Sequence, residues 1–252
     1  MATFQASGLS KTYATTSGPL LALENVDLRV EQGELISLLG PSGCGKSTLL
    51  NIFAGLLDRT DGEVTFEDQA VTKPRRDIGM MFQKPVLLPW RTILQNVMLS
   101  IEVLRLPKSE YESRARDVLS MVGLEQFANA YPHELSGGMQ QRAALSRVLV
   151  YEPKALLLDE PFGALDEFTR ETMNLELLRL WREQRYTVML VTHNIAEAVF
   201  LSTRVAVMTP RPGKVVDVVE IDLPQPRTRE VMRLPRYNEL IFEVRELLGV
   251  DR

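Results

Sequence analysis

The chain has 252 residues, of which 45% are hydrophobic and 25% charged, so it can bury one large core or two modest ones. Its net charge of -4 and isoelectric point near 5.4 give no basic excess of the kind that drives nucleic-acid binding. The single cysteine cannot form an internal disulfide, and the sequence has no apolar leader and no run of about 18 apolar residues. These features favour a globular, cytoplasmic protein that reaches a membrane only through a partner.

The first motif along the chain is a phosphate-binding loop. Residues 40–48 read Gly-Pro-Ser-Gly-Cys-Gly-Lys-Ser-Thr, between an apolar run at 35–39 and a helical pattern at 49–54. Its glycines would let backbone amides point at a phosphate, next to the positive end of the helix. Lys46 would reach the outer phosphates, and the Ser47 hydroxyl would coordinate magnesium. We therefore expect a nucleoside triphosphate to bind at Gly40, Pro41, Ser42, Gly43, Cys44, Gly45, Lys46, Ser47 and Thr48.

The strands and helices around this loop indicate an α/β core with an insertion. Residues 26–30 alternate apolar and charged, which is typical of a half-buried strand. The short apolar runs 78–82, 155–158 and 188–191 predict strands of a parallel sheet that is covered on both faces. Between the first two runs the pattern is helical from about 85 to 149, with Ser109-x-x-Glu112 as a capping box and Gly123 as a stop. A helical insertion thus interrupts the core.

The last part of the chain predicts a β-hairpin and a helix. Residues 205–208 and 215–219 flank the turn Pro210-Arg211-Pro212-Gly213, and apolar residues from 237 to 248 fall at helical spacing. We expect one domain over residues 1–252, without room for a further regulatory domain. Its expected parts are an α/β core with a β part (1–83 and 150–230), a helical subdomain (84–149) and a C-terminal helix (231–252).

Two acids follow the predicted strand at 155–158. Asp159 and Glu160 would lie at the carboxyl end of this strand, which is where open α/β sheets bind ligands. Asp159 is suited to hold magnesium, and Glu160 to polarise the water that attacks the terminal phosphate. Alone, the pair could be two acids in a solvated turn. The phosphate loop in the same chain favours the catalytic interpretation.

A second helix start that could face an anion lies at Leu135-Ser136-Gly137-Gly138, where Ser136 can cap the helix that follows. Such a serine alone is usually just a cap. Between the phosphate loop and the acid pair, however, it resembles the signature of the ATP-binding cassette (ABC) family, and the resemblance covers nearly the whole chain. It implies an ATPase with the phosphate-loop NTPase fold: a mixed, largely parallel sheet core, an N-terminal antiparallel β part and an inserted helical subdomain.

The resemblance also implies roles for single residues. Gln83 resembles the family glutamine that touches metal and attacking water, and His193 resembles the histidine that hydrogen-bonds the terminal phosphate. Tyr13 resembles the aromatic on which adenine stacks. In the family two cassettes sandwich two ATP molecules with Mg²⁺, so that Ser136, Gly137, Gly138 and Asp166 would serve the nucleotide of the partner subunit. ATP would close such a dimer and hydrolysis would open it.

Three segments indicate a branch of this family. Residues 87–93 (Leu-Leu-Pro-Trp-Arg-Thr-Ile), 159–166 and 208–213 resemble the ATPase subunits of importers for nitrate, sulfonates, taurine and similar small solutes. In these importers the segment around Trp90 helps to receive a cytoplasmic helix of the permease, although Trp90 as an ordinary core residue stays an open alternative. Met139 replaces the usual signature glutamine and Asn194 the usual aspartate, and neither change removes a phosphate ligand.

The expected partners are a second cassette, transmembrane permease subunits and, indirectly, a solute-binding protein, at the cytoplasmic face of the membrane and without nucleic acid. An exporter ATPase would share every catalytic residue and remains an alternative. A soluble cassette acting in DNA repair or translation is less favoured, because the chain has one cassette and no heptad run. The sequence specifies neither the solute nor whether the two cassettes are identical.

Overall fold

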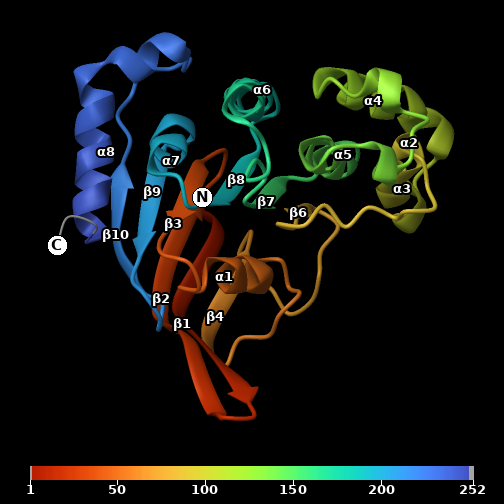
Figure 1. The fold of residues 1–252 in the computed structure, drawn as a ribbon. Coiled ribbons are helices and arrows are strands. Elements are labelled where there is room, and N and C mark those ends of the chain that lie inside the picture. Colours follow the sequence, from red (N-terminus) through yellow and green to blue (C-terminus); the bar gives the residue numbers. More distant parts are fainter. Residues whose placement is uncertain (1, 250–252) are drawn as a thin grey trace. The chain divides into compact units, whose positions relative to one another are not determined.

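The structure, a computed structural model, describes residues 2–249 (Figure 1). The chain divides into two compact units. Unit 1 comprises residues 1–75 and 180–252, and unit 2 comprises residues 76–179. Unit 2 therefore contains the expected helical subdomain together with the strands just before and after it. Positions 1 and 250–252 of the expected domain lie outside the described residues.

Unit 1 contains an antiparallel sheet of order β2-β1-β4-β5. Along β2 the side chains of Val26, Leu28 and Val30 are buried and alternate with exposed residues, which confirms the predicted half-buried strand. The ring of Phe4 lies 5.3 Å from that of Phe53 and 4.8 Å from that of Phe66, so the sheet and the helix after the phosphate loop share an aromatic core. The strands are β1 (Ala2–Thr15), β2 (Gly18–Glu31), β4 (Asp61–Phe66) and β5 (Gln69–Ala70).

Unit 1 also contains four strands in the order β10-β9-β3-β8. The strand β3 pairs in parallel with β8 and β9, and every residue of β3 and β8 is buried. The sequence predicts that the apolar runs of this sheet form strands covered on both faces, and this prediction is confirmed. The antiparallel pair of β9 and β10 is the predicted hairpin. The bounds are β3 (Leu35–Leu39), β8 (Thr187–Thr192), β9 (Arg204–Met208) and β10 (Val215–Glu220).

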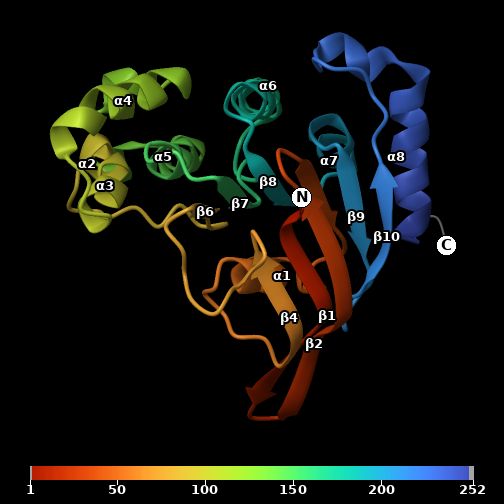
Figure 2. The same cartoon turned by 180° about the vertical axis from the view of Figure 1, so that it is seen from behind.

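The helices of unit 1 are α1 (Lys46–Phe53), α7 (Ile195–Leu201) and α8 (Pro235–Leu247), with a 3₁₀ turn η3 (Arg229–Arg233). The helix α8 is the predicted C-terminal helix. Proline stands at its first position, which suits a residue without a backbone N–H. Tyr237, Leu240 and Val244 form its buried face, and Figure 2 shows α8 alongside β10.

Unit 2 is built on a parallel pair of strands, β6 (Ile78–Met81) and β7 (Ala155–Asp159). Its helices pack closely on this pair: a Cβ at Gly79 would lie 2.6 Å from Val148 Cγ1, so only glycine fits there. The helical elements are α2 (Ile93–Val97), α3 (Leu99–Val103), α4 (Lys108–Met121), η1 (Glu125–Phe127), η2 (Pro132–Glu134), α5 (Gly137–Leu149) and α6 (Glu167–Gln184), of which α6 begins in this unit.

The capping box predicted at Ser109 and Glu112 is wrong. The helix α4 begins earlier, with extended Pro107 as its N-cap and no side-chain cap, so that Ser109 lies inside the first turn. Glu112 instead pairs with Arg116, one turn further along, at 3.2 Å. The stop was predicted correctly, because Gly123 adopts a φ of +68° just after the helix. Among residues 2–249, none of the helices has the length and apolar character needed to span a membrane.

Candidate nucleotide-binding and hydrolysis site

The phosphate loop lies between the buried strand β3 and the helix α1, as the sequence predicts. Gly43 and Gly45 have φ angles of +74° and +107°, which side-chain-bearing residues rarely adopt. A Cβ at Gly43 would meet no atom within 4 Å, so the backbone is open at this point. The amides of the first turn of α1 have no intrahelical acceptor, and they favour an anion at this end of the helix. The loop therefore has the form that a phosphate chain requires.

Lys46 is buried in the loop, with its side chain bound to the loop backbone. Its ammonium donates to the carbonyl oxygen atoms of Gly40 at 2.7 Å and Pro41 at 3.0 Å, and it lies 3.7 Å from Cys44 Sγ. The thiol of Cys44 is itself buried, with 1% of the residue exposed. These contacts place a positive charge and a packed thiol within the loop.

Tyr13 is brought to the phosphate loop from β1. Its hydroxyl lies 3.1 Å from Thr48 Oγ1, although the two residues are 35 positions apart. The ammonium of Lys11 lies 5.2 Å from the centre of the Tyr13 ring, within the range of a cation–π contact. The ring is half-buried. Within unit 1, Tyr13 therefore contacts the phosphate loop, as its predicted role requires.

The β9–β10 turn packs against the phosphate loop, a contact that the sequence does not indicate. A Cβ at Gly213 would lie 2.0 Å from the carbonyl oxygen of Cys44, and a Cβ at Gly40 would lie 3.0 Å from that of Met208. The amide of Gly213 donates to the Ala22 carbonyl at 2.9 Å. No local pattern marks this contact, because the turn and the loop are far apart in the sequence.

His193 follows β8 in unit 1 and is exposed. Both of its neighbours are bonded to the first turn of α7. The Thr192 hydroxyl donates to Glu197 Oε2 at 2.5 Å and accepts from the Asn194 amide at 3.1 Å. The Asn194 side chain accepts from the Glu197 amide at 3.0 Å and is the N-cap of α7. Asparagine caps a helix as well as aspartate does, so this departure from the family pattern keeps the local structure.

Unit 2 brings Gln83 and Glu160 into contact. The amide of Gln83 donates to Glu160 Oε2 at 3.3 Å across 77 positions of sequence. Glu160 has a φ of +47°, a left-handed conformation that is costly for a residue with a side chain and is held by its surroundings. Asp159, the last residue of β7, is 5% exposed. A glutamine and two acids therefore gather at the ends of β6 and β7.

Gln141 connects this group to α5, the helix that follows Ser136, and no local sequence pattern marks this role. Its amide nitrogen lies 3.3 Å from the carbonyl oxygen of Gln83 and 3.5 Å from that of Glu160. Its amide oxygen accepts from the Ala164 backbone at 3.2 Å. The residue is 4% exposed, so these contacts are shielded from water. One buried side chain on α5 thus contacts both the segment after β6 and the segment after β7.

Ser136 and Asp166 both cap helices of unit 2. The Ser136 hydroxyl accepts from the backbone of Met139 at 3.3 Å, so methionine at this position leaves the predicted cap intact. Asp166 Oδ1 accepts from the backbone of Thr169 at 3.0 Å, and this bond is the main cause of a lowered pKa at Asp166. A Cβ at Gly138 would lie 2.6 Å from Leu165 Cδ2, so the start of α5 lies against the segment before Asp166.

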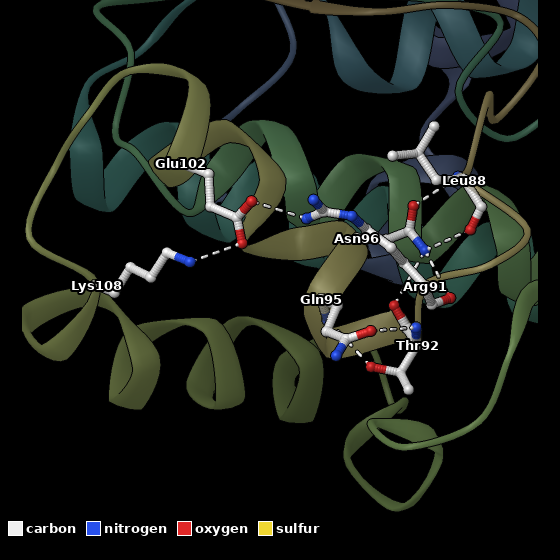
Figure 3. A network of polar contacts seen from close by, with 7 residues as sticks. All are labelled: Leu88, Arg91, Thr92, Gln95, Asn96, Glu102 and Lys108. Carbon is white, nitrogen blue, oxygen red and sulfur yellow. Dashed lines mark hydrogen bonds and ion pairs between the residues drawn. The ribbon is translucent and has the colours of Figure 1, made fainter.

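The segment around Trp90 is a loop whose backbone is hydrogen-bonded to the side chain of Asn96 (Figure 3). Trp90 is 71% exposed, so the alternative of an ordinary core residue is wrong. Asn96, with no exposed surface, accepts from the Leu88 amide at 2.7 Å. It also donates to the carbonyl oxygens of Leu88, Arg91 and Thr92 at 3.0–3.1 Å. The loop therefore holds Trp90 at the surface by a fixed backbone.

A phosphate loop between a buried strand and a helix, and a helical insertion whose signature helix starts at Ser-Gly-Gly, define a nucleotide-hydrolysing cassette. The ABC transporter family profile matches residues 23–163, and the chain belongs to this family. It is an ATP-binding ATPase.

Several transport ATP-binding proteins are similar to this chain. It is 44% identical over 236 residues to the bicarbonate transport ATP-binding protein CmpD of Synechocystis, covering 92% of this chain and 84% of that protein. It is 43% identical over 232 residues to the taurine import ATP-binding protein TauB of Rhizobium johnstonii, with coverages of 90% and 88%. The aliphatic sulfonates import ATP-binding protein SsuB of Bacillus cereus is 40% identical over 228 residues, with coverages of 90% and 89%.

A solved structure confirms the fold. The dimeric post-hydrolysis state of the ATP-binding cassette MJ0796 bound to ADP and phosphate has a TM-score of 0.80 and 36% identity to this chain. The match covers 86% of this chain and 98% of that one. The expected fold, with its antiparallel β part and inserted helical unit, is therefore correct.

Proposed function

We propose that this chain is the ATP-hydrolysing subunit of an ABC importer for a small solute of the nitrate, sulfonate or taurine kind. The similar proteins named above are ATP-binding subunits for the transport of bicarbonate, taurine and aliphatic sulfonates, which supports import over the exporter alternative. The observation that carries the hydrolytic role is the contact between Gln83 and Glu160 at the end of the buried strand pair.

In this proposal each site residue has one role. Glu160 acts as the general base that polarises the attacking water, and Gln83 orients that water. His193 donates a hydrogen bond to the terminal phosphate, and Lys46 neutralises charge on the outer phosphates. Tyr13 stacks on the adenine. Residues 40–48 hold the phosphate chain with their backbone amides.

Magnesium fits the donors that are present. Ser47, Gln83 and Asp159 offer a hydroxyl, an amide oxygen and a carboxylate, which are the hard oxygen ligands that Mg²⁺ prefers. Among residues 2–249 no group of three His, Cys, Asp or Glu side chains could hold a metal alone. The ion, when bound, supplies charge neutralisation at the phosphates.

The proposed partners are a second cassette and a permease. Ser136, Gly137, Gly138 and Asp166 would serve the nucleotide of the second cassette, and the solved relative is dimeric. The exposed Trp90 loop would contact a cytoplasmic helix of the permease, which places the chain at the cytoplasmic face of the membrane. A solute-binding protein would act on the permease from the other side.

Substitution of Glu160 by glutamine tests the hydrolytic role. Glu160→Gln should lower permease-stimulated ATP hydrolysis by about 100-fold or more, because general-base catalysis contributes about 10²–10⁴-fold, and it should leave ATP binding intact. Glu152→Gln is the matched control, since Glu152 also has a left-handed φ, of +50°, but pairs with Arg114 on α4. Hydrolysis by Glu160→Gln at the rate of the control would refute the assignment. Uptake of nitrate, taurine, an alkanesulfonate and bicarbonate into proteoliposomes with the cognate permease would identify the solute.

A further inference from the structure

The helix that follows His193 depends on the C-terminal part of the chain. The helix α7 has only seven residues, Ile195–Leu201, and a helix this short is not stable by itself in water. Its position must therefore come from tertiary contacts. Two residues from beyond β10, Arg227 and Tyr237, provide polar contacts near its two ends.

Arg227 holds the C-terminal end of α7. Its guanidinium donates to the carbonyl oxygens of Val199 at 3.1 Å and Phe200 at 2.7 Å, and to Ile221 at 3.3 Å. The last carbonyls of a helix lack intrahelical donors and carry partial negative charge, so a cation satisfies them well. Arg227 is 4% exposed, and burial lowers its pKa to about 10, which still leaves it charged at neutral pH.

Tyr237 holds the first turn of α7. Its hydroxyl donates to the Ala196 carbonyl at 3.0 Å, and the residue is 7% exposed. Tyr237 belongs to α8, which is fixed to unit 1 by the fully buried side chains of Leu240 and Val244. The contact therefore connects α7 to a well-anchored helix.

The first turn of α7 also fixes the backbone on both sides of His193, at Thr192 and Asn194. Glu197 accepts from the hydroxyl of Thr192, and its amide donates to the side chain of Asn194. A shift of α7 would carry these two bonds with it. The imidazole of His193 would then change its orientation, although His193 itself is not mutated.

We propose that Arg227 and Tyr237 are positioning residues for His193, so that the C-terminal segment 221–249 sets the orientation of this histidine during ATP hydrolysis. The inference rests on the role of His193 in the proposed function. Neither residue is proposed to touch the nucleotide, and both act through α7. The C-terminal segment would thus be part of the hydrolytic machinery.

The test is a double-mutant cycle with His193. Tyr237→Phe and Arg227→Lys are each made in the wild-type chain and in His193→Ala, and kcat and KM for ATP are measured with the permease present. Loss of one hydrogen bond, at about 1 kcal/mol, corresponds to a fall in kcat of about fivefold, with KM changed by less than about twofold. In the His193→Ala background neither substitution should lower kcat further. Tyr111→Phe, the same chemical change on α4, is the control and should leave kcat unchanged.

Each of the other possible results would refute one part of this proposal. An equal fall of kcat in both backgrounds would mean general destabilisation and would refute the positioning role. Wild-type kcat in both variants, with a low kcat in His193→Ala, would refute it as well while leaving the role of His193 intact. Wild-type kcat in His193→Ala would instead refute the role of His193 and this inference with it. Arg227→Lys retains the positive charge. It therefore provides a second test of the inference if Tyr237→Phe does not fold.

Discussion

Gly213 in the β9–β10 turn lies directly against Cys44 in the phosphate loop: a Cβ at position 213 would come within 2.0 Å of the Cys44 carbonyl oxygen. Contacts between non-bonded atoms this short do not occur, so any side chain at 213 must displace either the turn or the loop. The turn is also hydrogen-bonded to β2, because the Gly213 amide donates to the Ala22 carbonyl. The shape of the phosphate loop is thus coupled to a turn that is remote in sequence.

Gly213→Ala should therefore weaken ATP binding. Overpacking costs about 1–3 kcal/mol, and because the displaced group belongs to the phosphate loop we expect the Kd for ATP to rise about tenfold. Gly249→Ala is the control: it strains a backbone with φ of +68°, but its Cβ would meet no atom within 4 Å. Titration of both variants with a fluorescent ATP analogue checks the expectation. Unchanged affinity in Gly213→Ala would mean that the loop tolerates the shift.

Gln141→Leu should lower the rate of hydrolysis while ATP binding is kept. The substitution retains the side-chain volume but removes the contacts to the backbones of Gln83, Glu160 and Ala164. At about 1 kcal/mol for each hydrogen bond, a fall in kcat of about tenfold or more follows. Gln140→Leu is the control on the same helix, since its amide contacts Pro132 and Leu135 instead. Equal rates for the two variants would argue against a special position of Gln141.

Asn96→Ala should uncouple the Trp90 loop from the rest of unit 2. The change leaves part-buried backbone groups of Leu88 and Arg91 without the Asn96 side chain as their partner, which costs about 2–4 kcal/mol in the free energy of unfolding. Permease-stimulated hydrolysis should fall, whereas hydrolysis without permease should change little. Gln95→Ala removes only the exposed bond that the Thr92 amide donates to the Gln95 side-chain oxygen, and it should cost about 1 kcal/mol or less. Urea unfolding and hydrolysis with and without permease distinguish the two variants.

Glu102 should give the same region a stability that depends on pH. Its carboxylate accepts from Lys108 at 3.0 Å and from Arg91 at 2.9 Å, and these bonds hold its pKa below the ordinary value of 4.5 (Figure 3). Because the folded-state pKa is the lower one, the stabilisation is complete above pH 4.5 and is lost as the pH falls through the folded-state pKa. Glu102→Gln should thus be less stable than wild type at neutral pH and equally stable at strongly acidic pH. A stability difference that does not depend on pH would contradict this expectation.

The sequence predicted the elements whose signals are local. The glycines and Lys46 of the phosphate loop, the Ser136 cap and the apolar runs of β3, β7 and β8 each act within a few residues of themselves. The β9–β10 hairpin was predicted from its turn residues in the same way. The cap at Ser109 failed because Pro107, two residues earlier, starts α4 in its place.

The amino-acid sequence alone determined the family, the nucleotide and the order of elements, because backbone preferences and apolar periodicity depend on neighbouring residues. Only the tertiary structure decided that Gly213 supports the phosphate loop, that Gln141 joins Gln83 to Glu160, and that Arg227 and Tyr237 hold α7. These contacts join residues separated by 19 or more positions, and nothing in the local pattern of either partner specifies the other. They arise when strands and helices pack, which brings distant backbone carbonyls within reach of a single side chain.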